Sequence, residues 1–194
     1  GVLADSRAPA TANRLLAALR GVLRAAWRLG VMDGEAYRRA IDVPCVRGRR
    51  LPAGRELGVG EIRALLDSCG PCPRGRRDAA LLALLYGAGL RRAEAVAVAV
   101  EDLDLEHGGL LVKLGKGNKE RRCWLATGAV ELIEAWLAVR GRGDGPLLKP
   151  VNRGGRIINR SMAPSSVRDV ISALVRRAGI PAASPHDLRR TWVG

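Results

Sequence analysis

Apolar residues recur at helical spacing near the start of the chain, and they predict a helix over residues 11–29. Arginines 14, 20, 24 and 28 fall largely on other faces, and Gly30 is a typical residue for ending a helix. A shorter helix is expected to begin at Asp33 and run to about residue 41. The predicted apolar stripe of the first helix consists of Leu15, Leu19, Val22, Leu23, Ala26 and Trp27.

A denser pattern of apolar positions begins at Leu57. It predicts helices over residues 60–68, 77–86, 128–139 and 164–178, another after the turn at 87–90, and one opening at about His186. Two short strands, 110–114 and 120–125, are separated by the Gly- and Asn-rich residues 115–119, which is typical of a hairpin. The sequence therefore predicts a mainly α fold with a small antiparallel sheet, an α+β arrangement.

Between the two regions lies a segment rich in proline, glycine and arginine. We therefore divide the chain into a partial helical domain (1–43), a basic linker (44–56) and a larger domain (57–194). The linker arginines are candidates for contacts along a phosphate backbone, although the segment is also compatible with a merely solvated connector. These candidates are Arg47, Arg49, Arg50 and Arg55.

The charge of the chain indicates a polyanionic partner. Thirty-three Lys and Arg residues oppose 19 Asp and Glu residues, which gives a net charge of +14. All but four of the cations are arginine, which binds phosphate in a bidentate manner. Biased codon usage would explain arginine in place of lysine, but it would not explain the excess of cations over anions. Nucleic acid is the expected partner.

Four cysteines, too few and too scattered for a disulfide framework, indicate a reducing compartment, the cytoplasm. Cys69 and Cys72 form a C-x-x-C motif, which occurs in thioredoxin-type redox proteins. Such a motif requires a buried strand before it, whereas the preceding residues here have a helical pattern. A loop between helices is the favoured interpretation of the C-x-x-C motif.

No apolar stretch of the sequence is long enough to span a membrane.

Three short segments each present a cation or an imidazole at a constrained position. The first, GAGLRRAE, places Arg91 at a helix start with Glu94 on the same face, or it is an ordinary surface pair. The second, GKGNKERR, puts Lys116 in a predicted hairpin, or it is a solvated turn; a P-loop is excluded because Gly117 stands where Ser or Thr is needed. The hairpin cations Lys119, Arg121 and Arg122 are further candidates for DNA contacts.

The third segment, SPHDLRRT, places His186 and Arg189 on one helix face, although so short a motif by itself favours a structural role. Only one other histidine exists, His107, and neither has cysteines or carboxylates around it at the spacing of metal ligands. The sequence therefore predicts neither a metal site nor a cofactor.

Taken together and in this order, the three segments resemble the tyrosine recombinases, the phage-integrase and Xer-like family. The resemblance implies a partial core-binding domain, a catalytic domain, double-stranded DNA as substrate, and a homo-tetramer on DNA for the complete protein. It also implies cleavage by a tyrosine through a 3′-phosphotyrosyl intermediate, without metal or nucleotide. Arg91 and Arg189 would hold the phosphate oxygens, Lys116 would protonate the leaving 5′-oxygen, His186 would assist proton transfer, and Glu94 would support Arg91.

The sequence departs from the family pattern at the nucleophile. Its two tyrosines, Tyr37 and Tyr86, do not match the family's nucleophile position, and both ends of the chain are expected to be truncated. A DNA-binding remnant without cleavage activity is therefore an alternative to a recombinase. A relative of the type IB topoisomerases, which share this arrangement of residues, is a second alternative.

Overall fold

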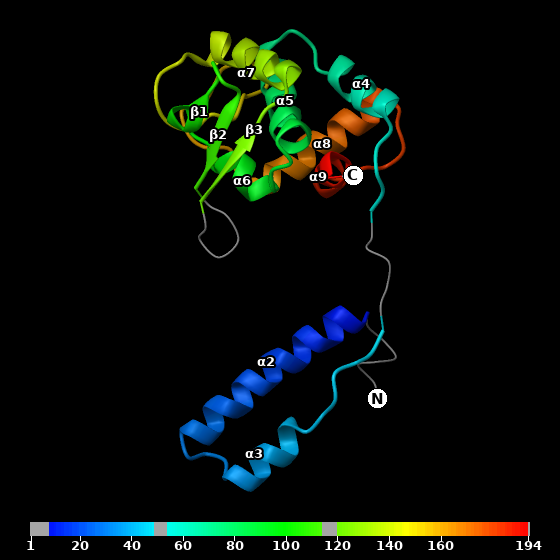
Figure 1. The fold of residues 1–194 in the computed structure, drawn as a ribbon, viewed down its shortest axis with the longest axis vertical. Helices are drawn as coiled ribbons and strands as arrows, with labels where there is room; N and C mark the ends of the chain where they lie inside the picture. Colours follow the sequence, from blue (N-terminus) through cyan, green and yellow to red (C-terminus); the bar gives the residue numbers. More distant parts are fainter. Residues whose placement is uncertain (1–7, 49–53, 114–119, 194) are drawn as a thin grey trace. The chain divides into compact units, whose positions relative to one another are not determined.

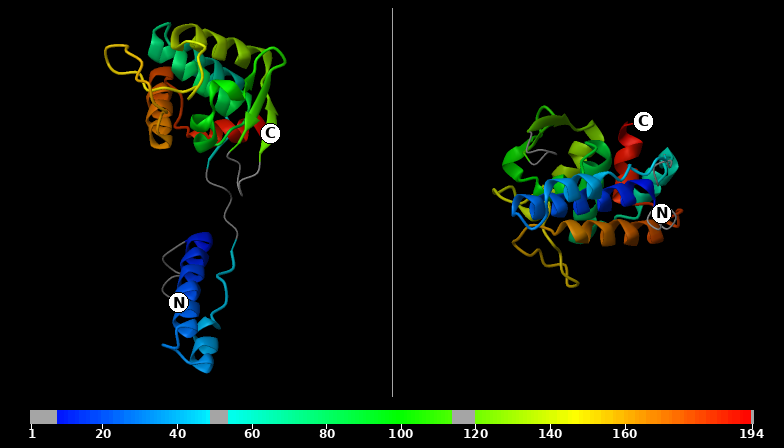
Figure 2. Two further views of the ribbon diagram at one scale, coloured as in Figure 1. Left: turned by 90° about the vertical axis from the view of Figure 1, so that its left-hand side faces the viewer. Right: turned by 90° about the horizontal axis from the view of Figure 1, so that it is seen from below.

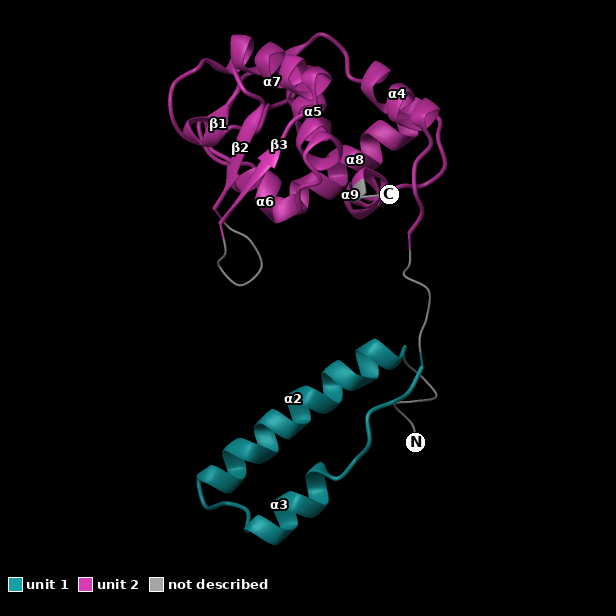
Figure 3. Cartoon of the chain, in the orientation of Figure 1, with its two compact units in different colours: residues 1–53 teal, residues 54–194 magenta. Residues whose placement is uncertain are grey.

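The computed structural model describes residues 8–48, 54–113 and 120–193. The chain divides into two compact units, residues 1–53 and residues 54–194 (Figure 3). Across the described ranges, no helix combines the length and the apolar character needed to cross a bilayer.

In its described residues, 8–48, the first unit contains two helices, α2 (Pro9–Arg28) and α3 (Gly34–Ile41). The Asp33 carboxylate caps α3 by accepting hydrogen bonds from the backbone N–H groups of Glu35 and Ala36. The rings of Trp27 and Tyr37 stack with their centroids 5.1 Å apart, which joins the two helices.

The predicted apolar stripe of α2 is not the face that this unit buries. Ala12 and Leu16 are the buried residues of α2, whereas Leu19 and Val22 are 52% and 66% exposed. The pattern identified the helix, but α3 is too short to cover the whole stripe. Most of the stripe therefore lies on the surface of this unit.

The second unit is mostly helical and contains one small sheet (Figure 1), which confirms the predicted fold class. Its helices are α4 (Val59–Asp67), α5 (Pro73–Leu82), α6 (Arg92–Ala97), α7 (Thr127–Arg140), α8 (Pro164–Ala178) and α9 (Pro185–Val193). A π-helical turn, η1 (Ala83–Gly87), extends α5, and a 3-10 turn, η2 (Val100–Asp102), precedes the sheet.

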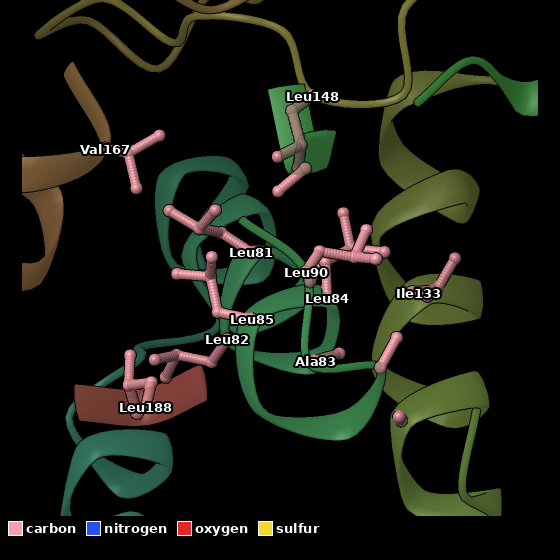
Figure 4. Packing of buried hydrophobic residues seen from close by; sticks show 14 of the residues in the cluster. Leu81, Leu82, Ala83, Leu84, Leu85, Leu90, Ile133, Leu148, Val167 and Leu188 are labelled. Atoms are coloured by element: carbon pink, nitrogen blue, oxygen red, sulfur yellow. The ribbon is translucent and has the colours of Figure 1, made fainter. Parts of the chain in front are cut away.

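The core of this unit surrounds α5 and η1. Leu81, Leu84 and Leu85 are fully buried there. Figure 4 shows the side chains that surround them, which come from α7, α8, α9 and the segment before α8. The run from Ala79 to Leu85, at the end of α5 and in η1, is therefore uninterruptedly apolar and buried, as expected of a segment enclosed by its neighbours. These neighbours include Ile133, Leu148, Val167 and Leu188.

The sheet has three antiparallel strands in the order β1 (Leu103–Asp104), β2 (Gly109–Val112) and β3 (Arg121–Trp124). Leu110 of β2 lies between Leu103 of β1 and Cys123 of β3, so one apolar face is continuous across the sheet. The two-residue strand β1 was not predicted, because so short a segment carries no alternating pattern. The sheet and α8 lie on opposite sides of the second unit (Figure 2).

Cys69 and Cys72 lie between α4 and α5, in the loop that the sequence favoured. Burial raises the pKa of the Cys69 thiol to about 12. A redox motif needs a readily formed thiolate, so this environment argues against redox function.

Candidate active site

A glycine-containing turn between η1 and α6 presents Arg91. Gly89 has a φ of +59°, a left-handed conformation that favours glycine. Arg91 itself has extended backbone and is the N-cap residue of α6, one position before the first helical turn in which it was expected. Its backbone N–H donates to Oε2 of Glu94 at 2.9 Å, so the helix start fixes both residues together.

Glu94 is the common anion of three arginines. Its carboxylate accepts a hydrogen bond from Nη1 of Arg91 at 2.8 Å and two from Arg121, at 2.7 and 3.1 Å. Nη1 of Arg189 lies 3.7 Å from Oε2 of the same carboxylate. The Glu94 side chain is only 2% exposed, so these cations compensate a charge that is almost completely withdrawn from water.

The pKa of Glu94 reflects the same balance. Burial by itself would raise it, but hydrogen bonds from Arg121 and from the backbone and side chain of Arg91 outweigh burial and lower the pKa to about 2. The carboxylate is therefore ionised throughout the neutral pH range, and it attracts the three arginines as an anion at every pH in that range.

Helix α9 presents His186 and Arg189. Its start is a capping arrangement in which the Asp187 carboxylate accepts hydrogen bonds from the backbone N–H and the hydroxyl of Ser184, at 2.8 and 2.7 Å. Pro185 occupies the first helical position, where its missing N–H is tolerated. Arg189 then lies one turn after His186, and its Nη1 donates to the Gly89 carbonyl of the turn that carries Arg91.

Arg91, His186 and Arg189 line one cavity of about 380 Å³. Arg91 lies almost a hundred positions before His186 and Arg189 in the sequence, and the contact between α9 and η1 brings them together. Two further arginines, Arg92 and Arg168, also line the cavity, and no carboxylate is among its lining residues. The cavity is therefore suited to an anion such as a phosphodiester.

Sequence reasoning missed Arg168. It lies in α8, where the apolar pattern identifies the helix but cannot show which polar position will lie beside α9. The only sequence signal is a cation on the polar face of a predicted helix, and many arginines of this chain share that property.

The predicted general acid, Lys116, lies outside the described residues. The predicted DNA contacts fall into three groups, of which the first, Lys119, Arg49 and Arg50, also lies outside the described residues. Arg47 and Arg122 are exposed, in agreement with contact to an external ligand.

Arg55 and Arg121 are instead bound to carboxylates of the protein. Arg55 makes two hydrogen bonds to Glu61, at 2.7 and 2.8 Å, and also donates to the carbonyls of Pro181 and Ala182. Arg121 makes its two hydrogen bonds to Glu94. The linker and hairpin patterns showed the charge of these residues, but they could not show that a distant carboxylate would engage it.

Neither tyrosine is among the residues that line this cavity. Tyr86 lies in η1 and lines a separate apolar cavity, and Tyr37 belongs to the first unit. Within the described residues, no group of three or more His, Cys, Asp or Glu side chains is arranged to hold a metal ion.

Comparison with known proteins agrees with this arrangement. Residues 56–193 match the model of the phage integrase family. The chain is 37% identical over 198 residues to the tyrosine recombinase XerD of Mycobacterium leprae, and 33% identical over 189 residues to the tyrosine recombinase XerC of Alcanivorax borkumensis. Both alignments cover 94% of this chain, which spans 59% and 58% of the length of these relatives.

A solved structure shows the same fold. The site-specific recombinase XerH, in a post-cleavage complex with its palindromic difH substrate, superposes with a TM-score of 0.70 over 96% of this chain and 54% of its own, at 23% identity. The family match extends over the whole second unit apart from its first two residues and its last one. The chain belongs to the phage integrase family.

Proposed function

We propose that the protein is a site-specific tyrosine recombinase that cleaves and rejoins double-stranded DNA. The observation that carries the proposal is the shared cavity of Arg91, His186 and Arg189, with Glu94 buried behind the two arginines. Relatives at 33–37% identity that are tyrosine recombinases support it.

The two arginines would hold the phosphate whose ester bond is exchanged. Arg91 and Arg189 approach the cavity from different helices, so they can bind the two non-bridging oxygens from different directions. Negative charge on these oxygens increases as phosphorus becomes five-coordinate, and preorganised cations stabilise that charge most strongly. Arg92 and Arg168 add positive potential around the same cavity.

The reaction is a transesterification, in which one phosphate ester bond is exchanged for another. A tyrosine oxygen attacks phosphorus and loses its proton with the assistance of His186, while the bond to the 5′-oxygen breaks. Lys116, as general acid, supplies the proton that the leaving 5′-oxygen takes up. We do not assign the nucleophile to Tyr86 or Tyr37.

We further propose that residues 1–43 act as part of a core-binding domain, that the linker follows the DNA backbone, and that the complete protein acts as a homo-tetramer on DNA. The net charge of +14 supports extended contact with phosphates. XerH and the Tn1549 transposon integrase, which share the fold, have been solved in complexes with DNA.

A suicide DNA substrate tests the proposal, because its cleavage releases a short fragment and traps the covalent intermediate. The full-length protein encoded by the gene should yield a protein–DNA adduct that survives denaturant. Absence of an adduct from full-length protein that binds the same duplex would contradict the proposal.

The alternative of DNA binding without cleavage is favoured for the 194 residues by themselves, because neither tyrosine lines the cavity. We expect this chain to bind duplex DNA and to form no adduct with the suicide substrate. An adduct would show that Tyr37 or Tyr86 is the nucleophile. Relaxation of supercoiled DNA without recombination would instead favour the topoisomerase alternative.

A further inference from the structure

The Arg121 guanidinium makes two hydrogen bonds to Glu94, one more than the Arg91 side chain, yet Arg121 does not line the cavity. It is the first residue of β3, and its guanidinium forms a two-pronged contact in which Nη1 binds Oε1 at 3.1 Å and Nη2 binds Oε2 at 2.7 Å. Such a planar, bidentate pair fixes the carboxylate in orientation as well as in position. Glu94 is therefore held from the sheet by a residue that does not line the cavity.

This arrangement leaves donors of the other two arginines available. Arg91 uses one side-chain nitrogen, Nη1, to bind Glu94, and Arg189 approaches the carboxylate only to 3.7 Å. Within the described residues, Nε and Nη2 of both arginines have no partner among the hydrogen bonds of the structure. Arg121 is thus the one arginine of the three whose guanidinium pairs with Glu94 through two nitrogens, and Arg91 and Arg189 each approach the carboxylate through Nη1 alone.

The position of Lys113 shows that the strand pair is attached to this region at a second point. Lys113 follows β2 directly and binds the buried carboxylate of Asp102 in η2. Asp102 contacts none of the three arginines that share Glu94. Lys113 is therefore a matched comparison for Arg121, because both anchor the sheet and only Arg121 contacts Glu94.

We propose that Arg121 is a positioning residue of the cleavage reaction, which acts by holding Glu94 so that Arg91 and Arg189 keep their free donors directed toward the phosphate. This inference rests on the proposed function. It assigns Arg121 a role inside the protein in place of the DNA contact that its sequence position suggested.

A first test does not depend on cleavage. In the 194-residue chain, the carboxyl titration of Glu94 is followed by carbon-detected NMR in the wild type and in Arg121→Met. The substitution removes the hydrogen bonds and the charge of Arg121, which lower this pKa, and leaves burial and the hydrogen bonds of Arg91, so the pKa of Glu94 should rise from about 2. Lys113→Met should leave this titration unchanged. An unchanged titration in Arg121→Met would overturn the inference, whatever the fate of the proposed function.

A second test measures cleavage by the full-length protein. Arg121→Met should slow cleavage at saturating DNA about a hundredfold, the cost typical of displaced catalytic groups. Arg63→Met, which removes one exposed cation from α4, is the control for loss of charge. DNA affinity should fall no further in Arg121→Met than in Arg63→Met, since a contact inside the protein is lost in both the free and the bound state.

Arg121→Lys separates charge from geometry, because lysine keeps the charge without the planar fork. It should remain strongly impaired, with its folding verified by thermal unfolding. Wild-type rates in Arg121→Lys, or equal losses of affinity and cleavage in Arg121→Met, would overturn the inference.

A substrate with sulfur in place of the 5′-bridging oxygen identifies the affected step, because a thiolate leaves without protonation. Lys116→Ala should recover on this substrate, whereas the deficit of Arg121→Met should persist. Recovery of Arg121→Met would place its effect on the leaving group and overturn the inference. Failure of the wild-type protein to cleave would refute the proposed function, and this inference with it.

Discussion

At the scale of single residues, the site is organised around one buried carboxylate. Glu94 is ionised and almost fully withdrawn from water, a state that is tolerable only because three guanidinium groups surround it. The chemistry of the phosphate is assigned to Arg91 and Arg189, but their positions depend on a residue that has no part in bond exchange. Mutation of Glu94 should therefore affect stability as well as activity.

Glu94→Gln keeps the shape of the side chain and removes its charge. We expect it to destabilise the second unit by about 3 kcal/mol, since it leaves clustered guanidinium groups without their anion. Denaturant unfolding of the 194-residue chain measures the change. Glu134→Gln, which breaks the more exposed pair with Arg142, should cost less than about 1 kcal/mol. Equal losses in the two variants would contradict the central place of Glu94.

The pH dependence of stability gives a second prediction for the same residue. The pKa of Glu94 is lowered in the folded state from its usual 4.5 to about 2. Its contribution to stability is therefore complete above pH 4.5 and is lost as the pH falls toward 2. The stability difference between wild type and Glu94→Gln should shrink across this interval. A difference that stays constant from pH 5 to about 2.5 would contradict the lowered pKa.

At the scale of elements, the turn after η1 packs directly against α9. Arg189 donates to the Gly89 carbonyl, and a methyl group added at Gly89 would lie 2.4 Å from Cε3 of Trp192 in α9. The left-handed conformation of Gly89 therefore serves two purposes, since it turns the chain toward α6 and lets α9 approach.

Gly89→Ala tests this packing. It should lower the free energy of unfolding by about 2 kcal/mol, through a strained backbone conformation and the contact with Trp192. Gly60→Ala is the matched control, because Gly60 lies in α4 with open space around it. There the substitution should be neutral or slightly stabilising. A neutral result at Gly89 would show that α9 does not require this close approach.

Elements with a strong local pattern were predictable from the sequence. The motif S-P-H-D specifies the start of α9 through capping chemistry, and the Gly-x-Gly pattern before Arg91 indicates a turn with a left-handed residue, which is Gly89. Residues whose role depends on distant partners were not predictable in the same way. The Glu94 carboxylate that engages Arg121, the placement of Arg168 beside α9, and the exposure of Leu19 and Val22 all depend on how elements pack.

At the scale of the whole molecule, positive charge is the dominant property. Four arginines line the cavity, and the chain carries a net charge of +14. Binding to duplex DNA should therefore release counterions, with a slope of log affinity against log salt of about −4 or steeper. Fluorescence anisotropy of labelled duplex at several salt concentrations measures this slope. A nearly flat response would contradict phosphate neutralisation as the basis of binding.

The measurement that tests the central proposal most directly compares cleavage and binding in one variant, Arg189→Ala of the full-length protein. Loss of a preorganised phosphate donor should reduce the cleavage rate at saturating DNA by about a hundredfold to a thousandfold. Affinity for the same duplex should change little, because many other cations contribute to binding. Equal losses of cleavage and affinity would show that Arg189 is only a general phosphate contact, and that the cavity is not the site of strand cleavage.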